Sequence, residues 1–403
     1  MRILLDVMFR LELMGGNVTH LRHLLSAWFA DGVDREHELF LVTRRENVEV
    51  LGPEFTDRMR VHPVGDRLAT PARLAWEQTV LPRVVHRLSP DVMLCPGNIS
   101  PLVSPVPTVV ILQNALPFCP RPPTTAVGTS AWWWRIVLGW FMRASNRTAT
   151  RTIFHSRYLR DLFVGRFGAD PDRCDVILNG ADSFSVPAAT TDADLAAALD
   201  DGGTLDRLGV RRPFLLDVGH LYAYKHIPAL VDGFAESGLA DRGYQLVLAG
   251  KETDRAHVAQ TRAAIARQGL GSSVALVGGL AHDEVASLLG SCEAFVFQST
   301  CENCPNALLE AIAAGIPIAS SIAGPMPEMG GDALEYYDPY RPSDIARALR
   351  NVALDPLVRE RLRGRAAARA TALPSWRRSG RETLDSLGRA AATAGRSSRR
   401  PPG

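Results

Sequence analysis

Short apolar runs, many of them β-branched, alternate with amphipathic stretches along almost the whole chain. This alternation is typical of βαβ units, in which helices connect the parallel strands of one sheet. It occurs in two series. In the first, we expect strands at 2–8, 39–42, 92–95, 108–112 and 152–154, with a helix over 134–145. In the second, we expect strands at 214–218, 244–249, 274–277, 294–297 and 316–320.

The two series are separated by residues 183–212, which are rich in Ala, Asp, Thr and Gly and show no strand pattern. We interpret this segment as a connector with a small helix near 193–200. The predicted domains are therefore 1–182 and 213–373. A last helix is expected over 374–390, and 391–403 is expected to be a disordered tail. A ligand would bind between the halves, at the carboxyl ends of the strands.

The composition narrows the class of protein further. The chain of 403 residues has a net charge of +2, which argues against a dedicated nucleic-acid binder. Only two of the 45 cationic side chains are lysines, Lys225 and Lys251, so we ask what each retained lysine does. No signal peptide and no apolar run of bilayer length is evident, which predicts a cytoplasmic protein.

The six cysteines are sparse and irregularly spaced, apart from Cys301-x-x-Cys304. No second pair of Cys or His residues follows at zinc-site spacing, so a zinc site is not expected. We expect six reduced, small apolar side chains, as in a reducing compartment.

An aromatic stretch near 131–143 contains Trp132, Trp133, Trp134 and Trp140 together with Arg135. One interpretation is a helix that packs on the first domain and shapes the acceptor side. The alternative is an interfacial helix that makes a peripheral membrane contact. The sequence does not decide between them.

Three segments carry candidate chemistry. Gly15-Gly16 follows the first strand, where glycines permit a tight turn or a close approach to an anionic ligand. Lys225 follows the strand 214–218, at the place where an ammonium could hold a phosphate, and His220 could add a hydrogen bond. The Gly15-Gly16 turn and Lys225 could each also have a purely structural role.

The third segment, 300–315, contains two acids eight residues apart, Glu302 before a predicted helix and Glu310 inside it. Pro305 suits the first helical turn and Gly315 the C′ position. Backbone amides of 303–306 would point at an anion, and the two carboxylates could bind hydroxyls on either side of it. A glutamate at this place can also be a helix cap.

Taken in order along the chain, these segments resemble the family 4 retaining glycosyltransferases, which have the GT-B fold. Glu302-x7-Glu310 resembles their EX7E motif. The matching segments are Gly15-Gly16-x3-His20, Ile153 to Arg160, Asn179-Gly180-Ala181-Asp182, Gly219-x5-Lys225, Ser320 to Glu328 and Ser375-Trp376. The resemblance implies an α/β protein of two Rossmann-like domains that face each other across a cleft, with the first domain on the acceptor side and helix 374–390 crossing back onto it.

The resemblance also implies the roles of single residues. Glu302 would bind hydroxyls of the donor sugar and Glu310 the nucleotide ribose, while Gly16 and Lys225 would hold the diphosphate. Glu302 and Lys225 would carry the catalysis. The further donor-side residues are Gly15, Gly219, His220, Leu280 in the loop 278–280 beside the base, Asn303, Cys304, Asn306 and Leu309.

Two positions depart from the family pattern. The family often has Arg where His220 stands, so the phosphate clamp loses a permanent cation unless His220 is protonated. It also often has His where Gln113 and Asn114 stand. Together with His20, these two would contact the sugar or the acceptor, but neither amide can act as a base.

We therefore assign no side-chain base. The expected reaction is transfer of a sugar from a nucleoside diphosphate sugar to an acceptor, with retention. The acceptor attacks on the face that the leaving group departs from, and the diphosphate takes its proton. No cofactor and no metal are required, and Asp192-Ala193-Asp194 lacks the preceding strand of a metal-binding motif. The base, sugar and acceptor (a glycan, a lipid-linked molecule or a natural product) are not readable. An epimerase or hydrolase of the same fold, or a non-catalytic nucleotide-sugar-binding subunit, remains the alternative.

Overall fold

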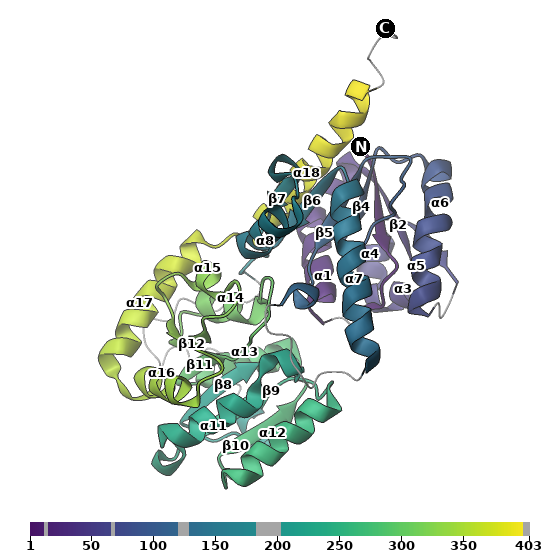
Figure 1. Ribbon diagram of the computed structural model, residues 1–403. Helices are drawn as coiled ribbons and strands as arrows, with labels where there is room; N and C mark the ends of the chain where they lie inside the picture. The colour runs from purple at the N-terminus through teal and green to yellow at the C-terminus, as the bar shows by residue number, and fades with distance from the viewer. Residues whose placement is uncertain (12–14, 66–68, 120–128, 183–202, 398–403) are drawn as a thin grey trace. The chain divides into compact units, whose positions relative to one another are not determined.

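The computed structural model describes residues 1–11, 15–65, 69–119, 129–182 and 203–397 (Figure 1). The chain forms two compact units. Unit 1 comprises Met1–Pro117, Ile136–Gly180 and Pro374–Gly403, and unit 2 comprises Phe118–Arg135 and Ala181–Leu373. Each unit is built on one parallel sheet, which confirms the predicted α/β class.

The sheet of unit 1 has the order β3-β2-β1-β4-β5-β6-β7, and its described neighbours pair in parallel. Leu4 of the central strand pairs with Phe40 on one side and Met93 on the other. Helices cover both faces, so the central strands are continuously apolar. The strands are β1 (Arg2–Val7), β2 (Glu38–Arg44), β3 (Arg60–Val64), β4 (Val92–Cys95), β5 (Thr108–Leu112), β6 (Arg151–Phe154) and β7 (Cys174–Val176).

The helices that connect these strands are α1 (Gly15–Ala30), α2 (Val33–Glu36), α3 (Arg45–Leu51), α4 (Pro53–Thr56), α5 (Thr70–Thr79), α6 (Leu81–Leu88), α7 (Thr129–Thr148) and α8 (Arg157–Phe167), with short 3-10 turns η2 (Leu116–Phe118) and η3 (Pro171–Arg173). The last helix of the chain, α18 (Trp376–Ser397), also belongs to unit 1.

Unit 2 has a parallel sheet of order β10-β9-β8-β11-β12-β13. Its strands are β8 (Phe214–Val218), β9 (Gln245–Ala249), β10 (Val274–Gly278), β11 (Ala294–Phe297), β12 (Ile318–Ser321) and β13 (Glu335–Tyr337). Its helices are α10 (Thr204–Leu208), α11 (Ile227–Ser237), α12 (Arg255–Arg267), α13 (His282–Ser291), α14 (Asn306–Ala313), α15 (Met326–Gly330), α16 (Pro342–Leu354) and α17 (Pro356–Ala372), with the 3-10 turns η4 (Ala223–Lys225) and η5 (Ala240–Arg242).

The sequence missed three strands, β3, β7 and β13, and each is an edge strand of its sheet. An edge strand is covered less completely than a central one, so it does not need a continuous apolar run. β3 illustrates this, because its residues are all exposed or half-buried.

Two predicted segments differ in extent. α18 continues to Ser397, so residues 391–397 are helical and the prediction that the tail begins at 391 was wrong for them. α7 begins at Thr129, before the predicted start. The helix predicted near 193–200 and the Asp192-Ala193-Asp194 motif lie outside the described residues.

α18 is anchored in the core of unit 1. Leu387 and Ala390 join the apolar cluster of the sheet, and Trp28 donates a hydrogen bond from Nε1 to the carbonyl of Gly380 at 2.9 Å. A Cβ on Gly180 would lie 2.3 Å from the backbone nitrogen of Trp376, so only glycine permits this approach. The last helix of the chain therefore completes the first unit.

Beneath the start of α18, two histidines are packed together. The ring centroids of His20 and His155 are 4.5 Å apart, and His20 lies 5.6 Å from Trp376. His155 Nδ1 is 2.7 Å from the carbonyl oxygen of Ile177, whereas Nε2 of both rings is buried and has no hydrogen bond to any described residue. Burial lowers the pKa of His155 to about 4 and lowers the pKa of His20 well below its usual range, with a further contribution from His155.

Both rings are therefore neutral in the folded protein, which predicts acid sensitivity. The unfolded chain takes up protons at these sites near pH 6.5, while the folded chain resists protonation. The stabilisation is complete above about pH 6.5 and falls toward pH 4, by about 1.4 kcal/mol per pH unit for each histidine. Melting curves of wild type and His155→Gln between pH 8 and pH 5 should show a smaller pH slope for the variant. Equal slopes would contradict the assignment.

Candidate nucleotide-sugar site

The site residues of unit 2 lie at the carboxyl ends of β8 and β11. These two strands are neighbours, and the strand order runs outward from them, with β9 and β10 on one side and β12 and β13 on the other. Such a switch point separates the loops that follow the two strands and is where open α/β sheets bind ligands. One loop carries Gly219 to Lys225, and the other carries Glu302.

The structure brings the two predicted catalytic residues together. Lys225 Nζ lies 2.9 Å from Glu302 Oε1, and the hydroxyl of Ser299 donates to the same oxygen at 2.9 Å. Lys225 is only 7% exposed, and its ammonium lies 4.3 Å from the centroid of the Phe297 ring. The ammonium is thus fixed by a carboxylate and an aromatic face at the edge of the sheet.

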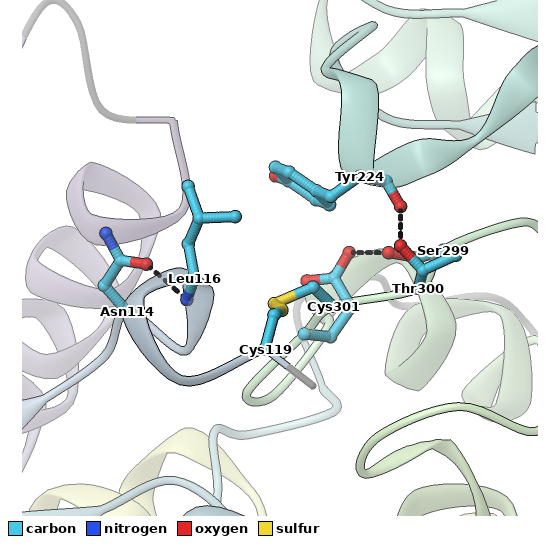
Figure 2. The surroundings of a disulfide bond; sticks show 8 residues. Asn114, Leu116, Cys119, Tyr224, Ser299, Thr300 and Cys301 are labelled. Atoms are coloured by element: carbon cyan, nitrogen blue, oxygen red, sulfur yellow. Dashed lines mark hydrogen bonds between the residues drawn. A yellow bond between two sulfur atoms is a disulfide. The ribbon is translucent and has the colours of Figure 1, made fainter. Parts of the chain in front are cut away.

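Hydrogen bonds hold the two loops in a fixed position relative to each other. Thr300 donates from its amide (2.8 Å) and from its hydroxyl (2.7 Å) to the carbonyl oxygen of Tyr224 (Figure 2). A Cβ on Gly219 would lie 2.9 Å from Lys225 Cε, so glycine leaves room for the lysine side chain. The lack of a side chain at Gly219 therefore allows Lys225 to take this position.

Asp217 is a site residue that the sequence reasoning missed. It lies near the end of β8, is buried, and accepts the backbone N–H of Gln298 on Oδ2 at 3.1 Å. Burial raises the pKa of Asp217 to about 6, while Lys225 and this hydrogen bond lower it. The available signal was an acid inside an otherwise apolar strand, which a buried charge network explains better than a solvated face does.

His220 stays neutral in this environment. Burial lowers the pKa of His220, and the charges of Lys251 and Lys225 lower it further. The amide of Lys251 lies 3.3 Å from His220 Nδ1, and a Cβ on Gly279 would lie 2.7 Å from Lys251 Cγ. The side chain of Lys251 thus runs across Gly279, in the loop of the predicted base contact Leu280, and both lysines of the chain lie at this sheet edge.

Glu310 lies on α14 and is 8% exposed. Burial raises its pKa to about 7, and within the described ranges its carboxyl group has no hydrogen bond and no ion pair. α14 begins at Asn306, with Pro305 at the N-cap, one residue later than predicted. Gly315 follows the C-cap with a φ of 70°, as predicted for C′.

The other predicted residues around α14 differ in accessibility. Asn303 is buried, Cys304 and Asn306 are half-buried, and Leu309 is completely buried. Leu280 is half-buried after β10. The Leu309 side chain therefore packs in the core of unit 2, and only its neighbours are open to a ligand.

In unit 1, Gly15 and Gly16 are the first residues of α1. A Cβ on Gly16 would meet no atom of the described residues within 4 Å, so no contact among them requires this glycine. His20, predicted to contact sugar or acceptor, is 3% exposed and lies 3.0 Å through Nδ1 from the side-chain oxygen of Asn179. The structure thus makes His20 a core residue.

Gln113 and Asn114 follow β5. The backbone N–H groups of both residues donate to Oδ1 of Asn98, at 2.6 and 2.8 Å. Gln113 donates from Nε2 to the carbonyl of Pro96, and Asn114 accepts the N–H of Leu116 (Figure 2). Both side chains hold the loop in place. Asn98, a buried residue with a φ of 70°, is their organising partner, and the sequence did not single it out.

The expectation of six reduced cysteines was wrong. Cys119 and Cys301 form a disulfide bond across 182 residues of sequence (Figure 2). The bond joins the segment after η2 to the loop that carries Glu302, whereas Cys95, Cys174 and Cys292 remain thiols. The spacing of cysteines along the chain does not predict a disulfide bond between two cysteines so far apart in the sequence. Within the described residues, no three His, Cys, Asp or Glu side chains gather as a metal site would require.

Two family models match the chain. The model described as Glycosyltransferase Family 4 matches residues 14–183, and the model described as Glycosyl transferases group 1 matches residues 207–369. A search of curated protein sequences found no match.

Solved structures resemble the chain over nearly its whole length. HepE from Anabaena, solved with UDP and glucose, is 17% identical with a TM-score of 0.71, and the match covers 96% of this chain and 99% of HepE. Sucrose-phosphate synthase from Thermosynechococcus elongatus is 17% identical (TM-score 0.70; 98% and 99% covered). WaaG, a glycosyltransferase involved in lipopolysaccharide biosynthesis, is 14% identical (TM-score 0.68; 96% and 99% covered).

The two parallel-sheet, Rossmann-like units have the GT-B fold. The two family models that match them identify a nucleotide-sugar-dependent glycosyltransferase. The chain belongs to the family 4, group 1 glycosyltransferases. The predicted fold and family are thereby confirmed.

The disulfide predicts a redox-dependent stability. A bond that closes a long loop stabilises a fold by about 2–4 kcal/mol, mainly by restricting the unfolded chain. We expect Cys119→Ser to lower the melting temperature without reductant and to match the wild type in excess dithiothreitol.

Cys292→Ser is the matched control, since Cys292 lies outside the disulfide and should leave the response to reductant intact. Thiol titration of the denatured, unreduced wild type should find four of the six cysteines reactive. Six reactive thiols in freshly isolated protein, with no effect of reductant on melting, would refute the bond.

Proposed function

We propose that this enzyme transfers a sugar from a nucleoside diphosphate sugar to an acceptor with retention of the anomeric configuration. The observation that carries the proposal is the Lys225–Glu302 ion pair at the switch point, with the buried carboxyl of Glu310, which pairs with no described residue, on the next helix. A lysine for phosphate and two carboxylates for hydroxyls are the groups that such a donor needs.

In this proposal Glu302 binds the donor sugar. Its Oε1 is already held by Lys225 and Ser299, so the carboxylate is oriented before the donor arrives, and no described residue bonds Oε2. Oε2 accepts sugar hydroxyls, Glu310 accepts ribose hydroxyls, and Lys225 contacts the diphosphate between them. Such preorganised positioning lowers the entropic cost of reaching the transition state.

The reaction breaks the bond between the anomeric carbon and the diphosphate oxygen, and the acceptor oxygen bonds to the same face of that carbon. The acceptor proton passes to the departing phosphate oxygen, so no side-chain base is needed. Lys225 stabilises the negative charge that develops on the diphosphate. This electrostatic stabilisation is stronger than in water because Lys225 is largely buried.

Lys251 is the second cation in our proposal. It lies beside the neutral His220, where the family often has an arginine, and no ion pair occupies its ammonium within the described residues. A diphosphate bound there would meet two lysines instead of a lysine and an arginine. Both lysines of the chain would then contact the diphosphate.

UDP-glucose is the first donor to test, because HepE has been solved with it. The alternatives give different products. An epimerase or hydrolase would consume the donor without forming a glycoside, and a non-catalytic subunit would bind it without any turnover. The acceptor would be bound by unit 1, and we assign it no chemistry.

The roles of Glu302 and Lys225 can be separated by ligand binding. A ligand at 100 times its Kd stabilises the folded state by about 2.7 kcal/mol. With UDP-glucose and UDP in a thermal-shift experiment, Glu302→Gln should lose the extra shift that the sugar gives and keep the shift given by UDP. Lys225→Met should lower donor turnover by about 100-fold or more. Equal sugar-specific shifts in wild type and Glu302→Gln would contradict the assignment of Glu302.

Glu310 should couple nucleotide binding to proton release. Its pKa of about 7 in the free protein leaves it half protonated at neutral pH. Two ribose hydroxyls that donate to the carboxylate would lower this pKa, so binding releases a proton and affinity rises as the pH approaches 7 from below.

Calorimetry of UDP binding at pH 7, in buffers of different ionisation enthalpy, measures this release. Glu310→Gln keeps the shape of the side chain but cannot titrate. Subtracting the proton release of this variant from that of the wild type therefore removes the contribution of UDP itself. We expect about half a proton in that difference and about tenfold weaker UDP binding. Identical proton release in both proteins would remove Glu310 from the ribose site.

A further inference from the structure

The exposed apolar side chains of this protein gather on one helix. Of the nine large apolar side chains that are exposed in the described part of the chain, five lie on α7: Trp133, Trp134, Ile136, Val137 and Trp140. Trp133 is 62% and Trp140 54% exposed. Tryptophans are costly to leave in water, so such a cluster marks a contact surface.

These residues form a stripe along α7, the helix whose course is seen in Figure 1. Positions 133, 136, 137 and 140 are spaced by three, four and seven residues, which places them on one face. The face continues into two arginines, because Arg143 follows Ile136 by seven residues and Arg147 follows Trp140 by seven. α7 contains no acidic residue over its whole length.

Three arginines lie beside the stripe without an acidic partner among the described residues. Arg143 and Arg147 of α7 and Arg166 of α8 are exposed, and in the ranges that the structure describes none of them pairs with an acid. The guanidinium groups of Arg143 and Arg166 lie 4.6 and 5.6 Å from the centroid of the Phe167 ring, which holds both charges next to the helix. The surface is therefore apolar at one end and cationic at the other.

We propose that this face of α7 docks on the surface of an anionic lipid bilayer. Tryptophans favour the headgroup region, and the arginines are complementary to anionic headgroups. No helix of the described chain is long and apolar enough to cross the bilayer, so α7 would lie in the interface. This docking goes beyond the transfer reaction and does not depend on it.

Vesicle sedimentation of the full chain tests the proposal. We expect binding to vesicles of phosphatidylcholine with one quarter phosphatidylglycerol, weaker binding to phosphatidylcholine alone, and loss of the difference at high salt. Brominated phosphatidylcholine mixed into the anionic vesicles should quench part of the tryptophan fluorescence of the wild type, since Trp133 and Trp140 would contact the lipid.

Two variants separate the apolar and the charged part of the surface. Trp133→Ser/Trp140→Ser should lower the partition coefficient by about tenfold or more. Arg143→Glu/Arg147→Glu should remove the preference for anionic lipid. The matched controls are Leu357→Ser, an exposed leucine on α17, and Arg87→Glu/Arg255→Glu, two exposed arginines without acid partners in the described chain. These controls should bind as the wild type does.

The proposal is overturned if the wild type does not bind anionic vesicles at low salt, or if the Trp133/Trp140 variant binds as well as the wild type. A change of oligomeric state in that variant, measured by light scattering and unaccompanied by any vesicle binding of the wild type, would show a protein interface instead. The melting temperature of every variant, compared with that of the wild type, provides the folding control. Because vesicle binding is measured without a sugar donor, its failure leaves the transfer reaction untouched.

Discussion

The ion pair between Lys225 and Glu302 determines the geometry of the site in unit 2. It joins loops that leave β8 and β11, two strands that are neighbours in the sheet although almost eighty residues separate them in the chain. A 2.9 Å contact between two largely buried charges requires both loops to be fixed. The bonds from Thr300 to Tyr224 and from Gln298 to Asp217 provide that restraint.

The same crowding of charge sets the electrostatics of the site. Burial raises the pKa of Asp217 and Lys225 lowers it, whereas burial lowers the pKa of His220 and the two lysines lower it further. Among the described residues no cation pairs with Glu310, and burial raises its pKa to about 7. The site thus combines a charged end, suited to a diphosphate, with an acid whose ionisation a ligand can change.

Unit 1 is organised by burial rather than by charge. α18 returns from the end of the chain and packs on the sheet, and the contact of Gly180 with Trp376 fixes where it starts. His20 and His155 fill the space beneath it as neutral rings. α7 leaves its apolar stripe outside this core, and that is why the stripe is available to a lipid surface.

The sequence by itself determined the two parallel sheets, because buried strands must be apolar, and it predicted Lys225, Glu302 and Glu310 as site residues from their place after strands and on a helix. Only the tertiary structure decided which distant residues meet. Asp217 and Lys251 joined the site through neighbouring strands, His20 became a core residue under Trp376, and Cys119 met Cys301. Local sequence patterns report whether a segment is buried and how it folds, but they carry no information on which segments become neighbours in space.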